Sequence, residues 1–189
     1  MEKTFREIQE LLLRLQHDGA FLRTLDTVPE RMIRALKNGN KIFWCGNGGS
    51  AAQCQHLSAE LLARLRYSRP ALASLALTAD TAFLTAWVND NADSRQMFSR
   101  QIEALGKPGD ILIALSTSGN SPNILAALES ARKNNMESIL FGGKGGGKAA
   151  GLADIALIVP SDCTQRIQEV HIMTGHRICE KIEDAFLSV

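Results

Sequence analysis

Two side chains with complementary acid–base chemistry, His56 and Glu60, lie four residues apart in a stretch that has the character of a helix. At that spacing the imidazole and the carboxylate share one helical face. Such a pair can exchange protons with a bound ligand near neutral pH. The same spacing is also common in surface ion pairs, so the two residues alone leave both interpretations open.

A glycine-rich turn directly precedes this helical stretch. Residues 42–44 form an apolar run that is typical of a strand buried in a parallel sheet, and three glycines follow within the next five residues. Backbone N–H groups in such a turn, together with the start of the following helix, attract anions. Asn47 and Ser50 add side-chain hydrogen-bonding groups. The coincidence of this first loop with the acid–base pair favours a binding site.

A second polar loop follows residues 111–115, which show another buried-strand pattern. It offers four hydroxyl groups at the start of a helix that Pro122 opens. The hydroxyl groups belong to Ser116, Thr117, Ser118 and Ser121. Hydroxyl groups at a helix N-terminus suit a phosphate monoester. The alternative is a Ser/Thr-rich loop in which Ser121 is an ordinary helix N-cap.

The last predicted helix, over residues 164–186, contains two histidines. One of its faces is a stripe of apolar side chains, formed by Ile167, Val170, Ile178, Ile182 and Ala185. His171 falls within this stripe and is therefore predicted to be packed in the core or in an interface. His176 points away from the stripe, so it is the better candidate for contact with a ligand. The alternative is an exposed or hydrogen-bonded side chain.

Strands and helices alternate along the chain, which predicts an α/β fold with a parallel sheet and helices on both of its faces. Strands are expected at residues 42–44, 71–77, 111–115, 138–141 and 155–159, and helices beyond those already named at residues 5–15, 28–36, 81–88 and 95–105. The expected strand order is 2-1-3-4-5. The first and third strands are then neighbours, so the two polar loops open into one crevice.

The composition fits one domain over residues 1–189, with an N-terminal helical segment (1–38) followed by an α/β sandwich (39–189). The chain is 45% hydrophobic and has a net charge of +1, so we expect a real core and no nucleic-acid or membrane partner. The four cysteines have no CxxC spacing and are expected to be reduced core thiols. Without a secretory signal pattern, a cytoplasmic protein is predicted.

Residues 142–148 satisfy the GxxxxGK pattern of a nucleotide-binding loop and follow a predicted strand. The next residue is Ala149, which lacks the hydroxyl group that binds Mg²⁺ in such loops. No apolar strand ends in an obvious metal-binding aspartate. We therefore interpret the segment as a flexible surface turn and not as a nucleotide site.

Three spaced motifs together resemble the SIS domain family, and within it the bacterial phosphoheptose isomerases. They are CGNGGSAAxxxH…E (residues 45–60), STSGNS (116–121) and TxRIQExH…H (164–176). The resemblance covers nearly the whole chain. It implies interconversion of sedoheptulose 7-phosphate and D-glycero-D-manno-heptose 7-phosphate, in heptose synthesis for cell-surface polysaccharide. It also implies a homotetramer and one zinc ion per subunit.

Carried over residue by residue, the resemblance implies roles for individual side chains. Glu60 and His176 become the catalytic pair, in which Glu60 removes a carbon-bound proton and His176 exchanges protons with the oxygens of an enediol. The implied zinc ligands are His56, Glu60, Gln168 and His176. The implied substrate contacts are Asn47, Gly48, Gly49, Ser50, Glu60, Asn89, Asp90, Ser116, Thr117, Ser118, Ser121 and Gln168. Zinc lowers the basicity of a bound Glu60, so both roles require one free carboxylate oxygen.

The segment after Asp90 departs from the family pattern, in which a glycine and an aromatic residue usually follow. Residues 91–96 read NADSRQ and are one residue longer, so an isomerase of a related ketose phosphate is one alternative. A non-catalytic SIS protein that binds the bacterial replication initiator is another, although those relatives lack the glutamate and the final histidine. A sugar-phosphate-sensing regulatory module is disfavoured, because no DNA-binding segment is evident.

Overall fold

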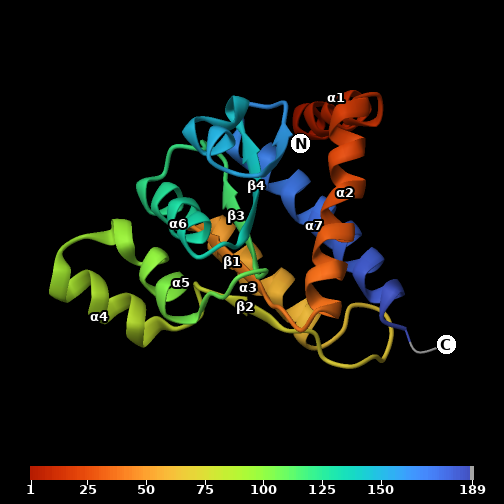
Figure 1. Cartoon of the computed structure of the whole chain (residues 1–189). Coiled ribbons are helices and arrows are strands. Elements are labelled where there is room, and N and C mark those ends of the chain that lie inside the picture. Colours follow the sequence, from red (N-terminus) through yellow and green to blue (C-terminus); the bar gives the residue numbers. More distant parts are fainter. Residues whose placement is uncertain (188–189) are drawn as a thin grey trace.

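The computed structural model describes residues 1–187 and contains a five-stranded parallel sheet flanked by helices (Figure 1). Its strand order, β2-β1-β3-β4-β5, confirms the predicted order. The strands are β1 (Ile42–Gly46), β2 (Ser74–Ala76), β3 (Ile111–Ser116), β4 (Glu137–Gly143) and β5 (Ile155–Val159). The α-helices are α1 (Glu2–Gln16), α2 (Gly19–Lys37), α3 (Gly49–Leu62), α4 (Thr81–Asn91), α5 (Ser99–Leu105), α6 (Pro122–Lys133) and α7 (Thr164–Ala185). None of the helices within residues 1–187 has the length and apolar character of a membrane span.

Strand β1, which lies between β2 and β3, is buried along its whole length because helices cover both faces of the sheet. Ile42 and Trp44 belong to the hydrophobic cluster that contains residues of α2, α3 and α7. Phe43 and Cys45 point the other way, into the cluster that contains residues of α5 and α6. Figure 1 shows the same arrangement, with α2 and α7 on one side of the sheet and α6 on the other.

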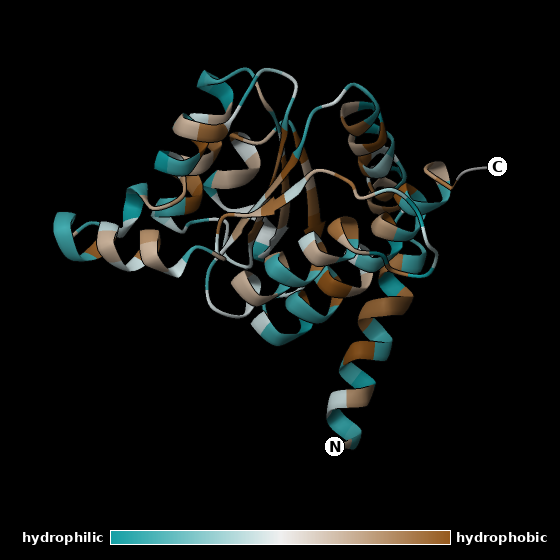
Figure 2. Ribbon diagram, turned by 90° about the horizontal axis from the view of Figure 1, so that it is seen from below, coloured by the Kyte–Doolittle hydropathy of each residue, from teal (hydrophilic) through white to brown (hydrophobic). Residues whose placement is uncertain are grey.

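The two N-terminal helices precede the sheet as predicted, but the second one begins earlier than residue 28. The Asp18 carboxylate accepts hydrogen bonds from the N–H groups of Ala20 and Phe21, both at 3.0 Å, and so caps α2 at its first residue. This cap adds more than two turns to the predicted helix. The preceding helix, α1, projects away from the sheet (Figure 2), and Phe5 on it is exposed.

The segment from β2 to α5 differs most from its prediction. β2 has three residues where 71–77 were expected, because pairing with β1 is confined to Ser74–Ala76. Helix α4 continues past residue 88 to Asn91, where Ala92 in a left-handed conformation (φ 49°) ends it. The predicted helix over 95–105 is divided into a 3-10 turn, η1 (Ser94–Gln96), and α5. The Asp93 carboxylate fixes that turn by accepting a hydrogen bond from the Arg95 N–H at 2.8 Å.

The glycine-rich segment after β4 is packed against the second loop, whereas the sequence predicted a flexible surface turn. Its first two residues complete β4, and two 3-10 turns follow, η2 (Lys144–Gly146) and η3 (Lys148–Gly151). The Ala149 N–H donates to the Gly119 carbonyl at 2.9 Å, and the Lys148 N–H donates to Asn120 Oδ1 at 3.1 Å. The segment is therefore a neighbour of the second loop and not a free turn.

The four cysteines are free thiols, as predicted. Cys45, Cys54 and Cys179 are buried, and burial raises the pKa of the Cys179 thiol to about 12, which keeps it protonated. Cys163 was expected in the core and is instead exposed, because it lies outside the sheet at the N-cap of α7.

Candidate functional site

Three side chains that can carry protons or bind a cation converge where α3 contacts α7. His56 and Glu60 lie on α3, and His176 lies on α7, 120 residues after His56. The two Nε2 atoms of the histidines are 2.7 Å apart, and His56 Nε2 lies 3.2 Å from Glu60 Oε1. The predicted helical pair thus has a third partner, which distinguishes it from a simple surface ion pair.

A glycine next to His176 lets the two helices approach this closely. A Cβ atom on Gly175 would lie 2.6 Å from Leu57 Cδ1, so any other residue would force the Leu57 side chain or α7 to shift. Leu57 and Cys179 are both buried in the same contact. The sequence signal for this contact is Gly175 itself. A glycine in the interior of a helix lowers helix stability, so its presence there indicates close packing.

The cluster of His56, Glu60 and His176 is partly open to solvent. The side chain of His56 is 48% exposed and that of Glu60 is 17% exposed, so a ligand can reach both. At 2.7 Å one histidine nitrogen donates a hydrogen bond to the other, and the tautomers of the two rings set which one donates. Atoms that can bind a metal ion, one from each residue, all lie within 4.8 Å of one another. Two imidazoles and a carboxylate are a set of ligands that zinc uses, so these residues fit a zinc ion.

Gln168, the fourth predicted zinc ligand, lies beside the first loop. Its Nε2 atom is 3.3 Å from Ser50 Oγ, and a Cβ atom on Gly49 would come within 2.8 Å of that same nitrogen. The side chain of Gln53 donates to the Gln168 carbonyl at 2.7 Å. The structure therefore brings Gln168 together with two predicted substrate contacts, two turns before His176 on α7.

The first loop is tied to the second through an amide pair that the sequence did not reveal. The side chains of Asn47 and Asn123 exchange two hydrogen bonds, at 2.9 and 2.8 Å. Asn123 lies in the first turn of α6, directly after the second loop. Gly48 is the N-cap residue of α3, with a positive φ of 56°, and it leaves the start of that helix without a side-chain cap. The amide pair and the pairing of β1 with β3 hold the two loops side by side, as predicted.

The second loop is shaped by its own hydroxyl groups. Ser116 Oγ accepts a hydrogen bond from the Gly119 N–H at 3.1 Å, and Ser118 Oγ accepts one from the Asn120 N–H at 3.2 Å. Ser121 stands at the N-cap of α6, but its side chain makes no capping hydrogen bond. The alternative, in which the Ser121 side chain is an ordinary N-cap, is therefore wrong. The start of α6 keeps N–H groups that can bind an anion.

Three further predicted residues, Asn89, Asp90 and His171, lie outside the cluster and the two loops. Asn89 and Asp90 are exposed in the last turn of α4, and no hydrogen bond or ion pair within residues 1–187 joins them to either loop or to the histidine–glutamate cluster. His171 is fully buried, as its place in the apolar stripe predicted. Its Nε2 atom lies 3.1 Å from the Gly142 carbonyl, and burial lowers the pKa of the imidazole to about 4.

Comparisons with known proteins identify the family of the chain. The sequence profile of the SIS domain matches residues 5–143. Phosphoheptose isomerase from Paramagnetospirillum magneticum is 50% identical over 179 residues, which cover 94% of this chain and 93% of that protein. Phosphoheptose isomerase 1 from Campylobacter jejuni is 46% identical over 186 residues, 98% of each chain.

Solved structures give the same result for the fold. Phosphoheptose isomerase GmhA from Neisseria gonorrhoeae superimposes with a TM-score of 0.89 at 37% identity, over 97% of this chain and 96% of that one. A phosphoheptose isomerase from Francisella tularensis superimposes with a TM-score of 0.91 at 34% identity, with the same coverage. Identity at this level over nearly complete chains shows common descent as well as a common fold. The chain belongs to the phosphoheptose isomerase family of SIS domain proteins.

Proposed function

We propose that the protein is a sugar-phosphate isomerase that converts sedoheptulose 7-phosphate to D-glycero-D-manno-heptose 7-phosphate. The observation that carries the proposal is the convergence of His56, Glu60 and His176 at the contact between α3 and α7. The proteins named phosphoheptose isomerase at about half identity support the choice of substrate. On the same basis we propose that the product enters heptose synthesis for cell-surface polysaccharide, in the cytoplasm.

The reaction moves a carbonyl group between C1 and C2 of the sugar, through an enediol. Glu60 is the proposed base that takes the carbon-bound proton and returns it to the neighbouring carbon. It approaches His56 through Oε1, so Oε2 is the proposed proton acceptor. His176 then moves a proton between the two sugar oxygens, which suits an imidazole near neutral pH.

The phosphate group is proposed to bind the second loop and the start of α6. The start of α6 offers N–H groups, and the adjoining loop offers the hydroxyl groups of Thr117, Ser118 and Ser121. Ser116 is buried and shapes the loop from below. Asn47, Gly48, Gly49, Ser50 and Gln168 are the proposed contacts of the sugar, together with Asn89 and Asp90.

Zinc is the proposed cofactor, with His56, Glu60 and His176 as ligands and Gln168 as a fourth. When bound, such an ion polarises the sugar carbonyl and stabilises negative charge on its oxygen. The protein's own side chains orient the sugar and transfer its protons. Removal of the metal with a chelator should lower turnover, and added zinc should restore it.

A homotetramer is the proposed assembly. Helix α4 has no buried residue, although it carries Phe83, Leu84, Trp87 and Val88, and α1 exposes Phe5 and Leu13. Apolar helix faces of this kind are typical of contacts between subunits. Light scattering after size exclusion should give four times the mass of the chain, and a monomer at micromolar concentration would contradict the assembly.

The function is tested by direct assay of the purified, zinc-loaded protein. Sedoheptulose 7-phosphate should be converted, and other ketose phosphates should be converted with a lower kcat/KM. Preference for another ketose phosphate would correct the substrate and keep the reaction class. No turnover of any ketose phosphate would overturn the proposal and favour a binding function.

A further inference from the structure

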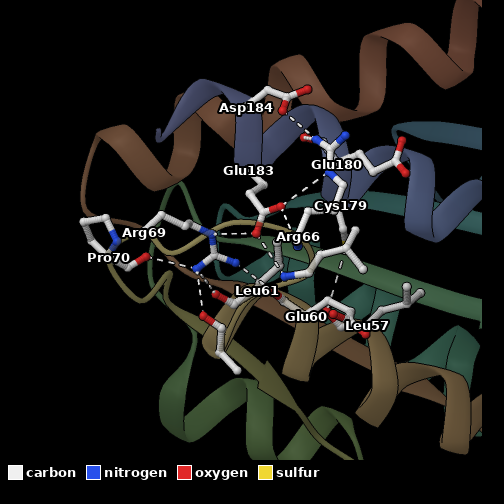
Figure 3. Close-up of polar contacts among 12 residues, drawn as sticks. Leu57, Glu60, Leu61, Arg66, Arg69, Pro70, Cys179, Glu180, Glu183 and Asp184 are labelled. Carbon is white, nitrogen blue, oxygen red and sulfur yellow. Dashed lines mark hydrogen bonds and ion pairs between the residues drawn. The ribbon is translucent and has the colours of Figure 1, made fainter. Parts of the chain in front are cut away.

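A buried ion pair, Arg69 with Glu183, lies close to Glu60 of the histidine–glutamate cluster, where α3 contacts α7 (Figure 3). Both side chains have no exposed surface, and Arg69 Nε lies 3.7 Å from Glu183 Oε1. Arg69 comes from the segment between α3 and β2, and Glu183 comes from the end of α7. A charge pair without solvent contact is costly to bury unless further hydrogen bonds satisfy both groups.

The guanidinium group of Arg69 donates hydrogen bonds to backbone carbonyl groups at the end of α3. Its Nη2 atom donates to the carbonyl of Glu60 at 2.6 Å, and its Nη1 atom donates to the carbonyl of Leu61 at 2.8 Å. Helix α3 has no basic residue in its last turn and ends at Ala63 without a glycine. Arg69 thus supplies the C-terminal cap that α3 lacks, and it does so at the backbone of the proposed base.

The carboxylate of Glu183 is satisfied by the backbone of the residues just before Arg69. It accepts hydrogen bonds from the N–H groups of Leu65 and Arg66, at 2.9 and 2.8 Å. Burial alone would raise the pKa of this carboxyl group, but these N–H groups and Arg69 lower it, so the group is charged at neutral pH. Glu183 lies seven residues after His176, which places both side chains on one face of α7.

We propose that Arg69 and Glu183 are positioning residues for the isomerase site, because together they fix α3, which carries Glu60, against α7, which carries His176. Arg69 holds the backbone of Glu60 directly, and Glu183 anchors the helix of His176 to the same guanidinium group. A hydrogen bond of 2.7 Å between side chains of two helices is sensitive to displacements well below 1 Å. The catalytic part of this inference rests on the proposed function.

Arg69→Gln is the test variant, and Arg66→Gln is its matched control. Arg66 lies in the same segment, bonds Asp184 at 2.5 Å and approaches Glu183 to 3.6 Å, but it is one-third exposed and binds no carbonyl of α3. Leu128→Ala is a second control. Leu128 is buried on the opposite face of the sheet, so its truncation lowers the thermal unfolding temperature, Tm, without touching the contact between α3 and α7.

Three experiments are done well below the Tm of each variant. Kinetics give kcat and KM for sedoheptulose 7-phosphate, competition with a chelator gives the zinc Kd, and NMR gives the imidazole signals of the metal-free protein. In Arg69→Gln we expect kcat to fall by about tenfold or more, a change of less than about threefold in KM, weaker zinc binding, and loss of the His56–His176 hydrogen-bond signature. Arg66→Gln and Leu128→Ala should keep kcat within about twofold of wild type.

A lower Tm in Arg69→Gln together with wild-type kcat, zinc affinity and histidine signals would overturn the proposal, because the pair would then serve stability alone. If Arg69→Gln does not fold, the same measurements on Arg69→Lys decide the question. Lysine keeps the positive charge next to Glu183 but lacks the planar guanidinium group that binds two carbonyl groups at once. The variant should therefore fold, while its kcat stays below that of the wild type. Absence of turnover in the wild type would refute the proposed function, and the histidine signals would still decide whether the pair positions the cluster.

Discussion

The histidine–glutamate cluster and the second loop form one proposed site, but they are built in different ways. The hydrogen bonds of Ser116 and Ser118 that shape the second loop are local, since they reach only three and two residues along the chain, and the glycine-rich segment supports the loop from outside. The cluster is assembled over a long range, since His176 meets His56 across 120 residues. The loop depends mainly on local backbone conformation, whereas the cluster depends on how two helices pack.

This difference predicts separate effects on the two kinetic constants. Changes in the cluster should act on kcat, because its residues are proposed to act on the reacting carbons and oxygens. Changes in the second loop should act on KM, because a phosphate group is bound in the ground state as well as in the transition state. If cluster variants mainly changed KM, or loop variants mainly changed kcat, this assignment of roles would be weakened.

The largest effect is expected from Glu60→Gln. The amide keeps the size of the side chain but cannot accept the carbon-bound proton, so kcat should fall by at least about 10²-fold while KM changes little. His176→Gln should behave similarly. Glu103→Gln is the matched control on α5, where the carboxylate is more than half exposed, and it should have wild-type kinetics. A Glu60→Gln enzyme with near-normal kcat would remove Glu60 from the role of base.

The next effect is expected from the double variant Ser118→Ala, Ser121→Ala. Hydrogen bonds to a charged phosphate contribute about 1.5–3 kcal/mol each, so KM for the phosphorylated sugar should rise at least about tenfold. The kcat value should change much less. Unphosphorylated sedoheptulose is the control substrate, because its weak turnover should be the same in the variant and in the wild type. An unchanged KM for the phosphorylated sugar would show that the phosphate binds elsewhere.

A smaller effect is expected from Gly147→Ala, which tests whether the glycine-rich segment supports the second loop. Gly147 has a φ of +52°, and a Cβ atom there would lie 2.5 Å from the Ser118 carbonyl. The loop must shift, so KM should rise several-fold, by about 3- to 10-fold, with kcat nearly unchanged. Gly151→Ala is the control, since a Cβ atom at that position meets no atom within 4 Å. Equal KM values for both variants would mean that the segment does not shape the loop.

The smallest effect on activity is expected from His171→Gln, which should change stability instead. The pKa of His171 is about 4 in the fold and 6.5 without burial, so the unfolded chain binds a proton first as the pH falls. The wild type should therefore lose about 2 kcal/mol of stability from this group between pH 7.5 and pH 5. In urea unfolding, the free energy of unfolding of His171→Gln should fall less between pH 7.5 and pH 5 than that of the wild type. The same loss in both proteins would assign the effect to other groups.

The sequence was sufficient for the local features. The buried strands and the second loop could be predicted because apolar runs, glycines and hydroxyl groups lie next to one another in the chain. The strand order followed from the alternation of strands and helices that defines the fold class. The cluster was only partly predictable: periodicity favoured His176 over His171, but the fit of Leu57 against Gly175 depends on two surfaces that no local pattern describes. Asn123 and Arg69 were missed for the same reason, since their partners lie far away in sequence.

Solvent deuterium exchange tests the central claim most directly. In heavy water the zinc-loaded wild type should place deuterium from solvent on C1 or C2 of the sugar phosphate as it interconverts substrate and product, and Glu60→Gln should lose this exchange together with turnover. That result is expected if Glu60 carries the proton through an enediol. Exchange at the wild-type rate in Glu60→Gln would contradict the account, because another group would then be the base.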